Sequence, residues 1–207
     1  WRRAFGWSCV GALLALPVAN AQAPVIGGAG FGRELVTADF NGDGHIDLAI
    51  GSPDTDSCEA CNGGNVTVMY GTADGIRRAG AQLWWQGGED VGGHAQVYDD
   101  FGSALAAADF SGDDYAELAV GVTGEDVDGH EDAGIVQYFF SFWEGVTDWD
   151  VMVSRAWPTC AAKPRVVEGF GRTLATGDFN GDGIDDLAIQ VFEDLGLVDP
   201  DTGMLCF

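Results

Sequence analysis

Basic residues are scarce in this chain of 207 residues, which has 9 lysines and arginines against 33 aspartates and glutamates. The net charge of −24 repels nucleic acids and anionic membrane surfaces, so both are excluded as partners. Histidine is also rare: there are three, all in glycine- or acid-rich turns without a nearby nucleophile pattern. No phosphate loop, dinucleotide fingerprint, nucleophile elbow or zinc-protease motif is present. We therefore predict that the chain is not an enzyme.

Long hydrophobic runs are absent after the N-terminal segment. Residues 1–21 have the layout of a secretory signal peptide, with Arg2 and Arg3 before an apolar stretch and Ala19-Asn20-Ala21 as a cleavage site. A buried first helix is the alternative, and residues 22–30 form a short linker. No later stretch could cross a bilayer as a helix. We therefore predict a secreted, extracellular or cell-surface protein that is not inserted in a membrane after signal cleavage.

Cysteines are few, and four remain after such cleavage: Cys58, Cys61, Cys160 and Cys206. An even number in an exported protein favours disulfides. Cys58 and Cys61 lie in a polar turn, which favours a local disulfide over a redox pair at a helix start. A zinc site would need a second pair nearby, and none is present. The connectivity stays open.

Glycine is abundant, with 32 residues, and one phrase occurs three times. The segment DFNGDGHIDLAIG begins at Asp39, DFSGDDYAELAVG at Asp109 and DFNGDGIDDLAI at Asp178, with spacings of 70 and 69 residues. A Phe-Gly pair precedes each by eight residues. The chain is therefore predicted to contain a repeat. The units are 31–100, 101–169 and a truncated third, 170–207.

Each full unit contains four short strand patterns separated by turn residues. They are 35–38, 48–51, 65–70 and 82–86 in the first unit, and 105–108, 118–121, 135–140 and 149–153 in the second. The predicted fold is all-β, with a four-stranded antiparallel sheet in each unit. Serial sheets of this kind build β-propellers, which typically need four to eight blades, so the propeller is incomplete. The third unit ends soon after its second strand, whose outer edge is expected to be unpaired.

These elements resemble FG-GAP repeats, the propeller blades of integrin alpha chains and their bacterial relatives. The Phe-Gly pair, the acidic turn, the Leu-Ala-Ile/Val-Gly strand and a following Gly-x-Val strand recur in order. The Gly-Ala-Pro element is imperfect, as Gly51-Ser52-Pro53 and Gly121-Val122-Thr123, and is absent from the third copy. The resemblance implies an extracellular module that binds a protein or glycan ligand, as in adhesion. The alternatives are an accessory propeller of an extracellular hydrolase and a carbohydrate-binding propeller. Five tryptophans could stack on sugars, although packing between blades is favoured: Trp84, Trp85, Trp143, Trp149 and Trp157.

The acidic turns are predicted to bind calcium. Counted from the first aspartate, side-chain oxygens fall at positions 1, 3, 5 and 9, and position 7 can offer a backbone carbonyl. Oxygen ligands on a flexible loop suit Ca²⁺. An EF-hand would need an acid at position 12, where Ile50, Val120 and Ile189 stand. The candidate ligands for two or three ions are Asp39, Asn41, Asp43, His45 and Asp47; Asp109, Ser111, Asp113, Tyr115 and Glu117; and Asp178, Asn180, Asp182, Ile184 and Asp186.

Position 6 of the turn requires a positive φ, which Gly44 provides in the first copy. In the second copy Asp114 stands there, and aspartate tolerates this conformation better than most residues. That copy also has Ser111 and the longer Glu117, so we expect weaker binding. A fourth acidic run, 124–134, includes Asp126, Asp128 and Asp132. We interpret it as a solvated loop.

Overall fold

The computed structural model describes residues 30–55, 63–87, 91–93, 95–155, 169–190 and 205–206. Within these ranges the regular elements are β-strands, and no helix is long and apolar enough to span a membrane. The predicted signal peptide, Cys58, Cys61, Cys160 and Trp157 lie outside the described residues, as does the side chain of Cys206. The predicted disulfide therefore stays a prediction.

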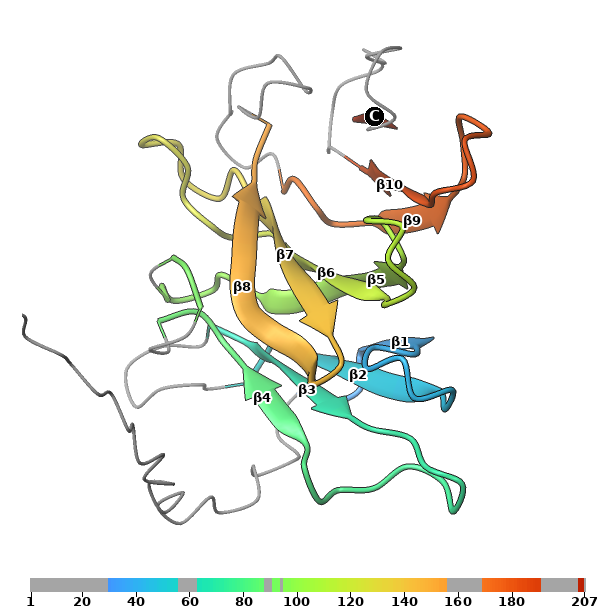
Figure 1. Ribbon diagram of the computed structural model, residues 1–207. Coiled ribbons are helices and arrows are strands. Elements are labelled where there is room, and N and C mark those ends of the chain that lie inside the picture. Colours follow the sequence, from blue (N-terminus) through green and yellow to red (C-terminus); the bar gives the residue numbers. More distant parts are fainter. Residues whose placement is uncertain are drawn as a thin grey trace, which may run out of the picture.

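The first unit forms one antiparallel sheet with its strands in chain order (Figure 1). The strands are β1 (Glu34–Ala38), β2 (Asp47–Ser52), β3 (Asn65–Met69) and β4 (Gln82–Trp84). Val36 pairs with Ala49, which pairs with Val68, so small and β-branched residues form a row across one sheet face. The four predicted strands are confirmed.

The second unit forms a matching sheet whose strands are longer than predicted. They are β5 (Phe101–Ala108), β6 (Glu117–Val122), β7 (Ile135–Phe142) and β8 (Gly145–Val153). The sequence predicts β5 from Leu105, but Phe101 already pairs with Val122, and the register shifts before Ala104. The prediction starts β8 at Trp149, but a tight turn pairs Phe142 with Gly145 and begins the strand there. The pairing of β7 with β8 is irregular between Phe139 and Ser141. This irregularity interrupts the alternation of polar and apolar residues along β8.

The third unit contains β9 (Leu174–Gly177), β10 (Asp186–Ile189) and β11 (Leu205–Cys206). β9 and β10 are antiparallel, as in the other units. The outer edge of β10, expected to be unpaired, instead carries β11 in parallel. A two-residue parallel pairing between distant segments has no local sequence pattern that could predict it.

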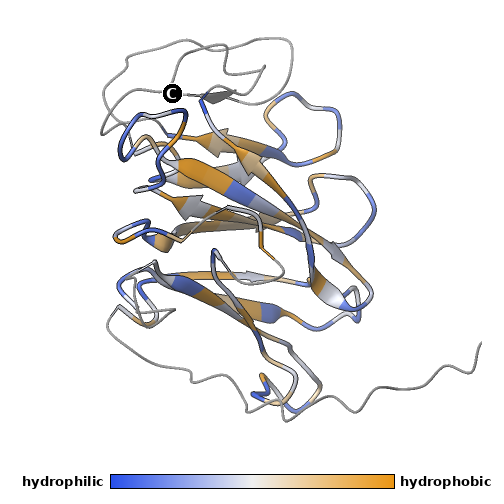
Figure 2. Ribbon diagram, turned by 90° about the vertical axis from the view of Figure 1, so that its left-hand side faces the viewer, coloured by the Kyte–Doolittle hydropathy of each residue, from blue (hydrophilic) through white to orange (hydrophobic). Residues whose placement is uncertain are grey.

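The three sheets pack face to face (Figures 1 and 2), with β1, β5 and β9 next to one another. The core between the first two sheets consists of Phe40, Ala49, Val66, Val68, Val91, Phe101, Leu118, Val120, Val122, Ile135, Phe139 and Val146. Trp84 contributes to it, with its ring centroid 5.5 Å from that of Phe139, which confirms the packing role predicted for this tryptophan. A second core lies between the second and third sheets. Stacked antiparallel sheets of this kind are propeller blades, as predicted.

The repeated Phe-Gly pair joins each blade to the one before it. Phe101 is fully buried, and its N–H donates to the carbonyl of Gly63 at 2.8 Å. Phe170 is equally buried and donates to Ala133 at 2.9 Å. A Cβ on Gly51 would clash with the carbonyl oxygen of Gly102, which follows Phe101. A Cβ on Gly121 would clash in the same way with the carbonyl oxygen of Gly171. Glycine at the end of the Leu-Ala-Ile/Val-Gly strand is therefore required by the close approach of the next blade.

Candidate metal sites in the hairpin loops

The three acidic turns are the hairpin loops between β1 and β2, β5 and β6, and β9 and β10, here called loops 1, 2 and 3. Position 6 has a positive φ in each, +84° at Gly44, +72° at Asp114 and +91° at Gly183, which confirms the prediction. Position 4 is also left-handed, at +67° in Gly42, +75° in Gly112 and +79° in Gly181. Sequence reasoning missed position 4, although a glycine in all three copies was the available signal.

The first aspartate of each loop organises the turn through backbone N–H groups. In loop 1 the carboxylate of Asp39 accepts from Asp43 at 3.1 Å and from Gly44 at 2.8 Å. Asp109 and Asp178 accept from the same positions of their own loops, and also from position 4 at 2.6 Å. Hydrogen bonds within the protein therefore hold the position-1 carboxylate in place without an ion.

Positions 3 and 5 are tied to each other in loops 1 and 3. Asn41 accepts from the N–H of Asp43 at 3.1 Å and donates its amide to the carboxylate of Asp43 at 3.2 Å. Asn180 and Asp182 repeat the arrangement. The aspartate at position 5 then accepts from the N–H of position 7 in all three loops: His45, Tyr115 and Ile184.

The acid at position 9 differs between the loops. Asp47 is fully buried and accepts from Phe40 at 2.9 Å through one oxygen and from Gly71 at 2.7 Å through the other. Glu117 is 1% exposed, and one oxygen, Oε2, accepts from Phe110 at 2.8 Å and from Ser111 at 3.2 Å. Its second oxygen, Oε1, is buried and accepts no hydrogen bond. Asp186 resembles Glu117, with one oxygen shared by the N–H groups of Phe179 and Asn180.

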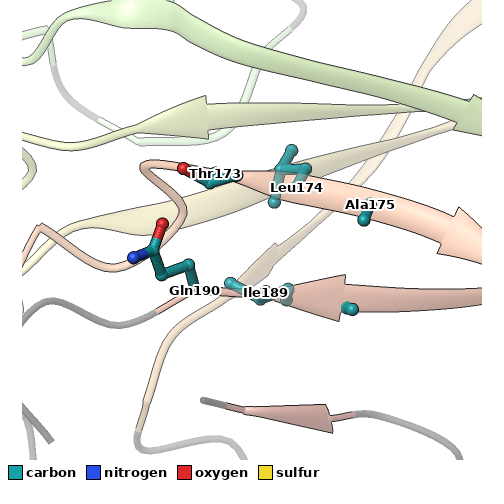
Figure 3. A pocket seen from close by; sticks show the side chains of 6 residues that line it. Thr173, Leu174, Ala175, Ile189 and Gln190 are labelled. Atoms are coloured by element: carbon teal, nitrogen blue, oxygen red, sulfur yellow. The ribbon is translucent and has the colours of Figure 1, made fainter.

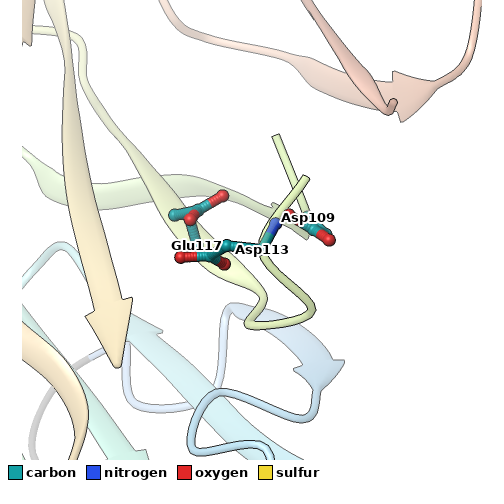
Figure 4. Close-up of side chains that lie close together, drawn as sticks. All are labelled: Asp109, Asp113 and Glu117. Carbon is teal, nitrogen blue, oxygen red and sulfur yellow. Dashed lines mark hydrogen bonds between the residues drawn. The ribbon is translucent and has the colours of Figure 1, made fainter. Parts of the chain in front are cut away.

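Loop 2 brings three carboxylates together (Figure 4), with one oxygen each from Asp109, Asp113 and Glu117 within 4.8 Å of one another. In the part of the chain that the structure describes, no other three acid, histidine or cysteine side chains meet this spacing. The predicted ligands of loops 1 and 3 share their loops without converging as closely. Glu117, whose longer side chain predicts weaker binding, is the position-9 acid that belongs to such a cluster, and the weaker binding stays a prediction.

Burial raises the pKa of the Asp47 and Glu117 carboxyls. Desolvation is the main cause for both, and neighbouring carboxylates add to it. Hydrogen bonds to backbone N–H groups oppose it at Asp47, and hydrogen bonds with Ser111, Phe110 and Tyr138 oppose it at Glu117. Burial and the charge of Glu117 also raise the pKa of Tyr138. A bound cation would offset this desolvation and repulsion. The loop 2 carboxylates, with one orphaned buried oxygen, thus fit a hard divalent cation.

The fourth acidic run is only partly the solvated loop that the sequence predicts. Asp126, Asp128 and Asp132 are exposed, but Glu125 is buried and accepts from the Gln86 amide of the first blade at 2.8 Å. Burial, with the charges of Asp99 and Asp126, raises the Glu125 pKa to about 7. Sequence reasoning missed this residue, because only the neighbouring blade buries it.

An open groove of about 340 Å³ lies on the third unit (Figure 3). It is lined by Thr173, Leu174, Ala175, Ala188, Ile189 and Gln190, none of which is titratable. The lining offers no acid or base for catalysis, and Thr173 carries its only hydroxyl group.

Four-stranded antiparallel blades with an acidic loop in the first hairpin define a class of β-propeller repeat. The FG-GAP repeat family matches this chain at residues 31–69, 101–139 and 170–191, within all three units. The chain belongs to the FG-GAP repeat proteins.

Curated relatives match over most of the chain. The human phosphatidylinositol-glycan-specific phospholipase D is 31% identical over 158 residues, which is 76% of this chain. The proteins of the same name from Bos taurus and Mus musculus are each 30% identical over 76% and 77% of the chain. The chain spans only 18% of the length of these relatives.

Proposed function

We propose that this chain is a calcium-binding β-propeller module that acts outside the cell and recognises a protein or glycan ligand without catalytic activity of its own. The observation that carries the proposal is the cluster of Asp109, Asp113 and Glu117, with a buried carboxylate oxygen that no protein donor meets. Three acids at such spacing repel one another unless a cation lies between them.

Calcium would be structural in this module. Bound calcium supplies charge neutralisation and accepts six to eight oxygen ligands. Asp109, Asp113 and Glu117 would hold it in loop 2, with the backbone carbonyl at position 7 as a further candidate. The side chains at positions 1, 3, 5 and 9 would hold it in loops 1 and 3. Since the hairpin fixes how β5 enters β6, a bound ion would stabilise the blade and the loops at its ends.

Metal counting tests this proposal. We expect Asp43→Ala, Asp113→Ala and Asp182→Ala each to remove about one calcium per chain, because each removes a central ligand. Asp128→Ala, in the exposed fourth acidic run, is the matched control and should remove none. Native mass spectrometry after equilibration in calcium gives the stoichiometry. A wild-type chain without bound calcium would overturn the proposal, and a loss at Asp128 would move the site.

Thermal melting supplies a second readout. An ion that binds only the folded state at 100 times its Kd adds about 2.7 kcal/mol per site. For a chain of this size, each 1 kcal/mol shifts Tm by roughly 2–4 °C. We therefore expect a rise of several degrees on replacing chelator with millimolar calcium. An equal Tm in both buffers would contradict structural calcium.

A second candidate is the accessory propeller of an extracellular hydrolase, because the relatives bear the name of a phospholipase. Incubation with a glycosylphosphatidylinositol-anchored substrate separates the two. We expect no release by this chain, since its described groove has no acid or base for catalysis. Release would assign the chain to the hydrolase. Trp149 is 60% exposed, so its ring could stack on a sugar. Binding on a glycan array that is lost in Trp149→Ala would identify the ligand as a glycan.

A further inference from the structure

The acidic loops of neighbouring blades touch one another at equivalent positions. In loop 1, a Cβ on Gly42 would lie 2.7 Å from Cε1 of Tyr115, the position-7 residue of loop 2. In loop 2, a Cβ on Gly112 would lie 3.3 Å from Cδ1 of Ile184, the position-7 residue of loop 3. The position-4 glycine of one loop therefore faces the position-7 side chain of the next, at both junctions.

A backbone hydrogen bond strengthens the first of these contacts. The N–H of Ala116, next to Tyr115, donates to the carbonyl of Asp39 at 3.2 Å. Asp39 is the position-1 residue that accepts from Asp43 and Gly44 and so shapes loop 1. Tyr115 in turn donates its N–H to Asp113, a member of the loop 2 cluster. A continuous path of contacts thus runs from the carboxylates of loop 2 to those of loop 1.

We infer that the ion sites of neighbouring loops are coupled, so that an ion in loop 2 raises the affinity of loop 1; this inference rests on the calcium binding proposed above. An ion that orders Asp113 also orders position 7, because the two are hydrogen-bonded. An ordered Tyr115 then restricts Gly42 and, through Ala116, holds Asp39. Loop 1 loses less conformational freedom when it binds its own ion, which is positive cooperativity between distinct sites.

Coupling is tested loop by loop, with hydrogen exchange of the full chain followed by mass spectrometry over a calcium titration. Asp113→Asn replaces a charged ligand by a neutral one only in loop 2 and so weakens that site. We expect the calcium midpoint for protection of residues 39–47 to rise about fivefold or more, the range of ordinary allosteric coupling. Asp182→Asn makes the same change in loop 3, for which no contact with loop 1 is found in the described residues. It should leave the loop 1 midpoint unchanged and raise that of loop 2.

A glycine pair tests the contact without removing any ligand. Gly42→Ala places a methyl group against the Tyr115 ring, and should raise the calcium midpoints of loops 1 and 2 together. Gly181→Ala at the equivalent position of loop 3 imposes the same backbone strain, since both glycines are left-handed, but its Cβ would have no neighbour within 4 Å. It should raise the midpoint of loop 3 alone. Tyr115→Ala keeps the position-7 carbonyl and should reduce the effect of Asp113→Asn on loop 1.

The outcomes separate the inference from the proposal on which it rests. If protection depends on calcium but the loop 1 midpoint is the same in wild type and Asp113→Asn, the coupling is overturned and calcium binding stands. The absence of calcium-dependent protection in every loop would overturn both. Slow exchange of the buried strand β6 serves as the folding control. If Asp113→Asn loses that protection, Tyr115→Ala decides alone: an unchanged loop 1 midpoint in this variant would overturn the coupling.

Discussion

The first and second blades have the same strands and the same loop backbone, yet they treat their position-9 acid differently. Asp47 places each oxygen on a separate backbone N–H and is satisfied by the protein alone. Glu117 places one oxygen on two N–H groups and leaves the other buried without a hydrogen bond, and its carboxylate belongs to the cluster with Asp109 and Asp113. The two blades therefore use this acid differently: the protein alone satisfies Asp47, whereas Glu117 keeps one oxygen that could bind an ion.

Two other pairs of equivalent positions also differ in their polar groups, in opposite directions. Thr55 and Glu125 occupy the same turn, since the carbonyl of each accepts from a glycine of the next strand segment, Gly64 or Gly134. Only the second blade places a buried carboxyl there. Tyr70 and Phe140 occupy equivalent positions of the first and second sheets. Only Tyr70 has a hydroxyl, which accepts a hydrogen bond from Val146 of the next blade. Blades with one backbone therefore distribute their buried polar groups differently.

The largest expected effect separates Asp47 from Glu117. Asp47→Asn turns an amide donor toward a backbone N–H and leaves a buried donor unsatisfied, which costs about 1–3 kcal/mol. We expect this loss of unfolding free energy already in chelator, and a larger loss in calcium, because Asp47 is also a proposed ligand of loop 1. In Glu117→Gln the amide oxygen replaces Oε2 as the acceptor for Phe110 and Ser111, the amide nitrogen replaces the unpaired Oε1, and a buried charge is removed. We expect it to cost nothing in chelator and to reduce only the stabilisation gained in calcium.

Urea denaturation of both variants in both buffers gives these four values. Asp128→Asn, at an exposed site, is the control for loss of a negative charge. A Glu117→Gln chain that is as destabilised in chelator as Asp47→Asn would remove the distinction between the two loops.

A smaller effect is expected from pH, through Glu125 and its counterpart Thr55. The folded-state pKa of Glu125 is about 7, above the ordinary value of 4.5, so the folded state binds more protons than the unfolded state between these values. The free energy of unfolding contributed by this group therefore falls as the pH rises from 4.5 to 7 and is constant beyond. Glu125→Thr copies the first blade and should flatten this slope.

The measurement is urea denaturation at several pH values in chelator, which keeps calcium release out of the comparison. Glu131→Thr changes an exposed acid of the same run and should keep the wild-type slope. Equal slopes in wild type and Glu125→Thr would show that the buried carboxyl is not the source of the pH dependence.

The smallest effect is expected at Tyr70. Its hydroxyl donates to Gln82 at 2.6 Å and accepts from the N–H of Val146 in the second blade at 3.0 Å. Gln82 also donates to the carbonyl of Val146 at 2.9 Å. Tyr70→Phe copies the residue that the second blade carries, and we expect a loss of about 1 kcal/mol in chemical denaturation. Tyr98→Phe, at a side chain that is 67% exposed, should change nothing. An unchanged stability in Tyr70→Phe would mean that water replaces the hydroxyl.

The blade architecture could be predicted from sequence because its signals are local. Alternation and turn residues lie within each strand and hairpin, and the repeat confirms one unit by the next. The left-handed position 6 was predictable even at Asp114, since the turn geometry dictates it. What could not be predicted depends on partners from another blade. The burial of Glu125 requires Gln86, and the free oxygen of Glu117 depends on side-chain reach into a packed interior. The start of β8 was missed because its pairing with β7 is irregular between Phe139 and Ser141, which breaks the alternation that a sequence pattern needs.

The glycine junctions have a consequence for how such chains can change in length. Gly51 receives the Gly102 carbonyl as Gly121 receives that of Gly171, and Phe101 and Phe170 make the same backbone bond to the preceding blade. The two junctions between blades therefore have the same backbone contacts. Removing or duplicating a segment from one Phe-Gly pair to the next would rebuild the same junction on either side. One unit can therefore be exchanged for another while the interfaces on both sides of it keep their shape.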